Sequence, residues 1–217
     1  MRLWNWIKRL FRKKQTTKPR PIEPVLPVGD FVPAKYINMY NELWDTMQIR
    51  MDKLSTINWY TKQIIKNRER YEKVAGLTNV PWELIGCLHL MEGSGDFKAA
   101  LHNGDLVIGN GRKTYRVPAG RGPFDSWEES AIDALSIKSQ PKKWGIVETL
   151  YYAERWNGLG YLRDPNKPNS PFLWSMSNHY IKGKYTRDSY YDPNAVSKQC
   201  GLALVLRELG YRYDKEN

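Results

Sequence analysis

The sequence predicts a mainly α-helical fold of the α+β kind, with one small β-hairpin beside a helical domain. After residue 33, most of the chain places apolar residues at helical spacing, in segments separated by glycine, proline and asparagine. Only residues 101–120 alternate short β-prone runs with Asn-Gly turns. A length of 217 residues allows one hydrophobic core plus a short tail, and an aromatic content of 13% excludes a disordered chain.

Residues 1–17 are expected to form a basic amphipathic segment. Apolar residues recur at helical spacing between Leu3 and Phe11, with cations on the opposite side. This pattern is typical of a helix that lies on an anionic membrane surface, here through residues 1–14. Lys8 and Arg9 interrupt the apolar residues, and no small-residue cleavage site follows, so the segment is not a signal peptide. The alternative is a solvated basic tail.

Residues 18–33 contain five prolines and are expected to form an extended linker, which leaves residues 34–217 as the folded domain. The cations that precede the first acidic residue contribute +8 to the net charge of +11, so the rest of the chain carries only +3. Because the positive charge belongs mostly to a tail, we do not expect a nucleic-acid partner. No stretch is apolar over the length of a membrane span.

Helices are expected in six segments of the domain, with Gly76 and Gly210 as stop signals in the second and the last. These segments are residues 34–51, 57–76, 81–93, 125–138, 144–158 and 192–210.

Three of these segments carry clear start signals. Pro81 suits a first helical turn because its missing N–H would have no partner there. Ser126 and Glu129 have the spacing of a capping box. Asp192 precedes Pro193 as a candidate N-cap.

Glu92 stands out because its carboxylate lies on or beside the apolar stripe of a helix that ends in "EGSG". Burial and the partial negative charge of a helix C-terminus both disfavour an ionised carboxylate. A carboxyl that keeps its proton can act as a general acid, and glycosidic bond cleavage is the reaction that most often uses one. Glycines without side chains would let a bulky polymer approach. The alternative is a helix-terminal Glu exposed by fraying, with the glycines acting only as caps.

A second segment, "YYAERWNGLGY", places sugar-binding groups at the end of another helix. Asn157 can form hydrogen bonds, Gly158 leaves room, and Tyr161 can stack on a sugar ring. Together with "HLMEGSGDFKAALHNGD", the segment resembles the goose-type lysozymes and soluble lytic transglycosylases of the lysozyme-like superfamily, over about residues 79–210. Two departures are that Gly93 stands where those families usually have Ser, and Trp156 where they have Tyr.

The resemblance implies a lysozyme-like fold in which a small β region lies beside the active-site cleft and Asn157 faces the catalytic Glu92. It further implies a muramidase or endolysin that cleaves the β-1,4 bond between N-acetylmuramic acid and N-acetylglucosamine in peptidoglycan. Two alternatives stay open: a lytic transglycosylase that forms 1,6-anhydro products, and a non-catalytic glycan- or membrane-binding protein. We expect no cofactor, a monomer, and cytoplasmic synthesis with action at the cell envelope.

Asp96 and Asp105 are candidates for a second carboxylate that activates water or stabilises an oxocarbenium ion, and the retaining or inverting outcome stays open. His89 and Glu92 have a metal-ligand spacing, but no second such pattern exists, so no metal site is predicted. Trp174 and Tyr180 are expected as exposed rings of an aromatic wall, although core packing is the usual role of such rings. The candidate substrate-binding residues are His89, Ser94, His102, Asn157, Gly158, Tyr161, Trp174 and Tyr180.

Overall fold

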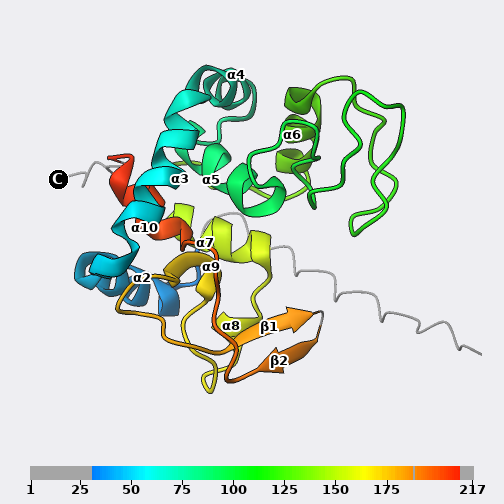
Figure 1. The fold of residues 1–217 in the computed structure, drawn as a ribbon. Helices are drawn as coiled ribbons and strands as arrows, with labels where there is room; N and C mark the ends of the chain where they lie inside the picture. The colour runs from blue at the N-terminus through cyan, green and yellow to red at the C-terminus, as the bar shows by residue number, and fades with distance from the viewer. Residues whose placement is uncertain (1–30, 188, 211–217) are drawn as a thin grey trace, which may run out of the picture.

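A computed structural model describes residues 31–187 and 189–210 (Figure 1). The predicted basic segment 1–17 and residues 18–30 of the predicted linker lie outside these ranges. The described part is mainly α-helical with one two-stranded antiparallel sheet, which confirms the coarse prediction. The elements are α2 (Ala34–Thr46), η1 (Met51–Lys53), α3 (Leu54–Lys66), α4 (Arg68–Thr78), α5 (Trp82–Gly93), α6 (Trp127–Ser136), α7 (Ile146–Asn157), α8 (Gly160–Arg163), α9 (Pro171–Trp174), β1 (Lys184–Arg187), β2 (Tyr190–Asp192) and α10 (Leu202–Glu208).

Helix α5 lies at the centre of the fold. All residues from 84 to 91 are buried, so the helix is covered on every side and not only along the predicted stripe. Helices α3, α4, α7 and α10 pack against it (Figure 1). A Cβ at Gly86 would lie 2.6 Å from Cγ2 of Ile64, so the missing side chain allows α3 to come close. The end of α5 that carries Glu92 is thereby held in a rigid core.

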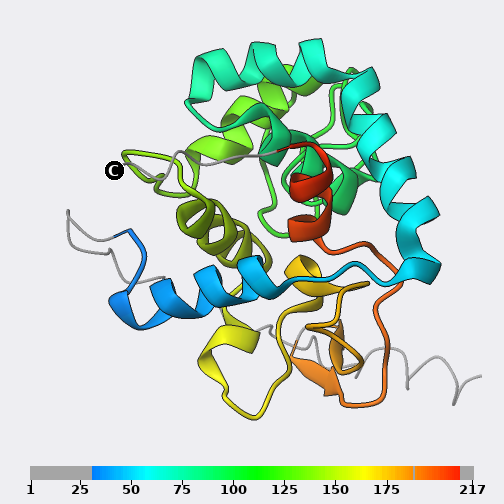
Figure 2. The same cartoon turned by 90° about the vertical axis from the view of Figure 1, so that its left-hand side faces the viewer.

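Helices α2 and α7 pack against each other away from α4 and α6 (Figure 2). The ring of Phe31, which precedes α2, meets the ring of Tyr151 in α7 edge-on at 5.7 Å. Val32 is also buried. The packed domain therefore includes the last residues of the predicted linker, although α2 itself begins at Ala34 as expected.

The sheet is not where the sequence predicted it. Strands β1 and β2 pair with Tyr185 opposite Tyr191, near the end of the chain. Residues 101–120 instead form turns, with one isolated bridge between Ala99 and Leu106. The buried carboxylate of Asp105 accepts the backbone N–H of residue 115 at 2.8 Å and that of residue 116 at 2.9 Å. The Asp105 side chain thus accepts the hydrogen bonds that these two amides would otherwise donate to a neighbouring strand.

Several predicted helix boundaries also differ. The segment 57–76 belongs to two helices that meet at Asn67, and Gly76 lies inside α4, which ends at Asn79 in a left-handed conformation. Asp192 does not begin a helix, because its Oδ1 accepts the N–H groups of Asn194 and Ala195 and closes a turn. Helix α10 starts later, at Leu202.

Other boundaries agree with the sequence patterns. Ser126 and Glu129 form the predicted capping box of α6. Gly210 has a φ of 74°, which suits the residue that follows a finished helix. In the described part of the chain, no helix combines the length and apolarity that a membrane crossing needs.

Candidate active site

Glu92 lies in the last turn of α5 and is half-buried. The indole Nε1 of Trp156, in the last turn of α7, donates a hydrogen bond of 3.0 Å to its Oε1. The pair joins the C-terminal ends of two helices that are 64 residues apart in the chain. Since both helices pack in the core, the bond fixes the orientation of the carboxyl group.

The chain turns sharply after Glu92, as the glycines suggested. Ser94 has a φ of 54°, and its N–H bonds the carbonyl of His89, which ends the helix. Gly104 then returns to the same point, where a Cβ would lie 2.3 Å from the backbone oxygen of Glu92. Gly104 also has a φ of 73°, so close approach and backbone conformation both require glycine at this position.

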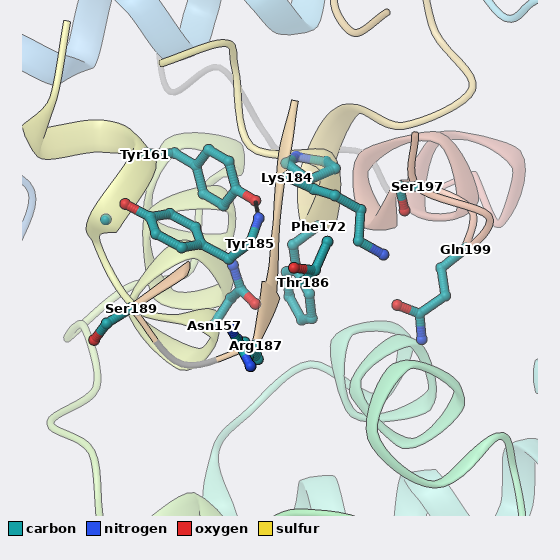
Figure 3. Close-up of a pocket in the computed structure, with 13 residues that line it drawn as sticks. Asn157, Tyr161, Phe172, Lys184, Tyr185, Thr186, Arg187, Ser189, Ser197 and Gln199 are labelled. Atoms are coloured by element: carbon teal, nitrogen blue, oxygen red, sulfur yellow. Dashed lines mark hydrogen bonds between the residues drawn. The ribbon is translucent and has the colours of Figure 1, made fainter. Parts of the chain in front are cut away.

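A pocket of about 840 Å³ opens beside this helix end (Figure 3). The predicted residues Asn157, Gly158 and Tyr161 line one side of it. The remaining lining residues are Gly160, Pro171, Phe172, Lys184, Tyr185, Thr186, Arg187, Ser189, Ser197 and Gln199. Aromatic rings and polar side chains together suit the alternating apolar and hydroxyl-bearing faces of a sugar polymer.

Glu92 is not among the lining residues, but two indirect contacts connect it to the pocket. Asn157 directly follows Trp156, the partner of the carboxylate. Gln199 lines the pocket and donates from Nε2 to the carbonyl oxygen of Met91 at 3.1 Å. The acid is therefore one residue removed from the pocket lining on each of these two paths.

His89 does not belong to the site surface. Its side chain is fully buried, with Nδ1 3.0 Å from the hydroxyl of Tyr71 and Nε2 3.1 Å from the carbonyl oxygen of Asp96. Burial lowers its pKa to about 4. The prediction that His89 binds substrate is wrong, since a ring without exposed surface cannot touch a ligand. It packs against Trp127 and ties the turn after Glu92 to the core.

His102 is a second structural histidine. Its Nε2 lies 2.7 Å from Oδ2 of Asp133 in α6, its ring stacks on Phe124 at 5.5 Å, and its side chain is fully buried. Burial lowers its pKa. Substrate contact is therefore wrong for His102 as well. Ser94, by contrast, is exposed in the turn after Glu92 and stays a candidate.

The two candidate second carboxylates have different environments. Asp105 is fully buried and holds backbone amides through Oδ2, so it organises the loop 105–116 and is not exposed to a substrate. Asp96 is exposed, and its Oδ1 accepts the N–H of Lys98 at 2.8 Å. Of the two predicted residues, only Asp96 stays available to solvent.

The predicted aromatic wall of Trp174 and Tyr180 is wrong. Trp174 is 1% exposed and Tyr180 is 3% exposed. The hydroxyl of Tyr180 accepts the N–H of Ser197 at 3.2 Å, which fastens the chain after β2. Tyr161 and Tyr185 provide the rings of the pocket instead.

The sequence did not predict three features of the site. These are the bond from Trp156 to Glu92, the position of Gln199 in the pocket lining, and the hairpin residues that line the pocket. Trp156 could have been found, because it directly precedes Asn157 in the motif already singled out. Gln199 carried no signal, because it lies in a stretch predicted as helix.

Comparison with protein-family models, with curated proteins and with solved structures finds no match for this chain. The resemblance to goose-type lysozymes therefore stays a prediction from the sequence motifs around Glu92 and Asn157. Within the described residues, no group of three or more His, Cys, Asp or Glu side chains could hold a metal ion.

Proposed function

We propose that the protein is a lysozyme-like glycosidase that cleaves the glycan strands of peptidoglycan, with Glu92 as its general acid. One observation carries the proposal: a carboxyl at a helix end, oriented by the Trp156 indole, is one residue removed from the lining of an open pocket that contains Asn157 and two tyrosine rings. A general acid must be held within reach of the leaving oxygen, and the two packed helices supply that rigidity.

The reaction follows from the roles available. Glu92 protonates the glycosidic oxygen between two sugars, and the bond breaks through an oxocarbenium-like transition state. The resulting carboxylate then accepts a proton from the group that attacks the anomeric carbon. Asp105 is occupied by backbone amides, so a route with a second carboxylate would have to use the exposed Asp96, whereas a route through Glu92 alone needs no second carboxyl.

A one-carboxyl route accommodates two outcomes. Water as the attacking group gives a hydrolase, whereas the 6-hydroxyl of the same muramic sugar gives a lytic transglycosylase with a 1,6-anhydro end. Mass spectrometry of the soluble products distinguishes them, because the anhydro product is lighter by one water.

The decisive test compares the wild type with Glu92→Gln on purified peptidoglycan. The amide keeps an oxygen that can accept the Trp156 N–H but cannot donate an acidic proton, so turbidity loss should fall at least about 1000-fold while the thermal midpoint stays unchanged or rises. Glu83→Gln, in the first turn of the same helix, is the matched control and should retain activity. Full activity of Glu92→Gln would exclude the proposed role.

A further inference from the structure

We propose that the β1–β2 hairpin forms a subsite for a carboxylate substituent of the glycan, with Lys184 and Arg187 as its specificity-determining residues. This inference rests on the proposed function, because it assigns the substrate class of the same pocket. Both cations line the pocket, together with Asn157 and Tyr185. A polymer of neutral sugars carries no anionic group that could pair with these two cations.

The hairpin is fixed to the body of the protein, so its cations have defined positions. The hydroxyl of Tyr161 in α8 accepts the backbone N–H of Tyr185 in β1 at 2.9 Å. The rings of the same two residues meet edge-on at 5.2 Å. A Cβ at Gly160 would lie 3.3 Å from the Tyr185 ring, so the hairpin packs directly on the segment that follows Asn157.

Among the residues that the structure describes, those that line the pocket carry only positive charge. Among the described residues, neither Lys184 nor Arg187 forms an ion pair, and no described residue that lines the pocket is acidic. The guanidinium of Arg187 lies 4.6 Å from the ring centre of Tyr190, which holds it without neutralising it. In Figure 3, Lys184 extends from β1 toward Gln199, whereas Arg187 ends near Asn157. An anionic group bound between these points would supply the missing charge.

The chemistry of the ligand follows from this arrangement. A sugar hydroxyl needs only neutral hydrogen-bond partners, whereas a carboxylate gains most from an ammonium and a guanidinium. Peptidoglycan strands carry a carboxylate on the lactyl ether of muramic acid where no peptide is attached, and carboxylates on the peptide where one is joined to that ether as an amide. Polymers of N-acetylglucosamine carry neither. The hairpin should therefore select strands that contain muramic acid.

The test uses the full-length chain and the double variant Lys184→Gln/Arg187→Gln. Two solvent-exposed ion pairs of about 0.7 kcal/mol each predict roughly a tenfold rise in KM on peptidoglycan strands freed of phosphate polymers. On soluble N-acetylglucosamine oligomers the variant should differ less than twofold from the wild type. The tenfold difference should shrink as salt is raised.

Two matched variants make the outcome specific to charge inside the pocket. Lys182→Gln removes a cation of the same segment that bonds Asn194 and does not line the pocket, so it should behave as the wild type. Lys184→Arg/Arg187→Lys keeps both charges and should restore most of the affinity. Equal losses on charged and neutral polymers, or no loss on either, would overturn the proposal.

Binding to full-length Glu92→Gln separates this inference from the proposed function. If the hairpin cations select carboxylates, that variant should bind muramic-acid strands more tightly than neutral oligomers, and this preference should vanish when Lys184 and Arg187 are also replaced. A wild type that cleaves nothing would remove the proposed activity and leave this binding result intact. If the wild type is active but Glu92→Gln shows no preference for muramic-acid strands, the proposed function stands and the proposed hairpin subsite is excluded.

Peptide-bearing and peptide-stripped strands identify which carboxylate is bound. Stripping exposes the lactyl carboxylate, so a charge effect confined to stripped strands assigns the lactyl group. One confined to peptide-bearing strands assigns a peptide carboxylate, and an effect on both means that the subsite accepts either. Each of these results supports a carboxylate subsite.

Discussion

At the level of single residues, the bond from the Trp156 indole to Glu92 determines how the acid is presented. A half-buried carboxyl at a helix end has several rotamers, and an unheld one would pass through the productive orientation only part of the time. The indole bond selects one orientation of the carboxyl group. In the proposed mechanism, Trp156 is a positioning residue, which acts through Glu92.

Replacing Trp156 with Phe should lower kcat by about tenfold to a hundredfold, since a hydrogen bond to an acidic group contributes about 1.5–3 kcal/mol. KM should change less than twofold, because Trp156 does not line the pocket. Trp144→Phe is the matched control, because its buried Nε1 has no hydrogen-bond partner among the described residues and its loss should leave kcat unchanged. A normal kcat for Trp156→Phe would show that Glu92 needs no such support.

Residue identity predicted the acid but not the roles of its polar neighbours. His89, His102 and Asp105 all lie close to Glu92 in sequence, yet each is buried and bonded inside the protein. A histidine that bonds a backbone carbonyl and one that binds a sugar look the same in the sequence. They differ in whether the side chain points into the core or toward solvent, and the sequence does not show this direction. Only the three-dimensional path of the chain after residue 92 decides this.

At the level of elements, α6 anchors the irregular loop that follows Glu92. Its Asp133 bonds His102 and Arg121, and its Ser130 accepts the backbone N–H of Leu101 at 3.2 Å. Its Glu128 also holds Arg70 of α4 through two bonds. The loop thus depends on a helix that begins with a capping box.

Ser126→Ala should lower the free energy of unfolding by about 1 kcal/mol, because the first turn of α6 loses the side chain that accepts the N–H of Glu129. Ser136→Ala, at the exposed C-terminal end of the same helix, should cost less than about 0.5 kcal/mol. Urea denaturation of both variants makes the comparison. Equal effects would mean that the capping box contributes nothing specific.

The element-level predictions succeeded where local signals act alone. The capping box and periodicity of α6 and α7 are local, and both helices form as predicted. The hairpin was misplaced because Asn-Gly turns also suit an irregular loop, and the burial of Asp105 that stabilises that loop is a tertiary event. The real strands, rich in Tyr and Thr, have no Asn-Gly signal between them.

At the level of the whole molecule, two buried groups shape the dependence of stability on pH. Burial raises the pKa of Glu154 from 4.5 to about 8, and lowers that of His89 from 6.5 to about 4. The folded state therefore keeps the Glu154 proton that the unfolded chain releases, so stability is lost as pH rises toward 8. In the folded state His89 stays neutral, whereas in the unfolded chain it binds a proton below pH 6.5. Stability is therefore lost as pH falls from 6.5 toward 4.

Between pH 6.5 and 8 only the Glu154 effect operates, and stability should fall by about 1.4 kcal/mol per pH unit. Below pH 6.5 the His89 effect opposes the Glu154 effect, and His102, whose pKa burial also lowers, adds to the His89 effect, so the fall should not extend below pH 6.5. Glu154→Gln should remove the alkaline fall, and Glu69→Gln, at an exposed site, should not. Urea midpoints at pH 6 and 8 check this, and a wild type equally stable at both would contradict the burial of an unpaired acid.

The basic segment defines the last prediction, since residues 1–30 precede every described part of the core. Deleting them should leave the thermal midpoint and the cleavage of soluble glycan fragments unchanged, because the packing that holds α5 and α7 begins at Phe31 and Val32. Clearing of intact cells should slow, because eight cations that attract anionic lipid at about 1 kcal/mol each are lost.

The slowing should disappear at high salt, where the attraction is screened. Vesicle sedimentation with and without anionic lipid measures the same interaction without catalysis. Loss of activity on soluble fragments would make the segment part of the catalytic domain, and unchanged behaviour on cells and on anionic vesicles at low salt would reduce it to a solvated tail.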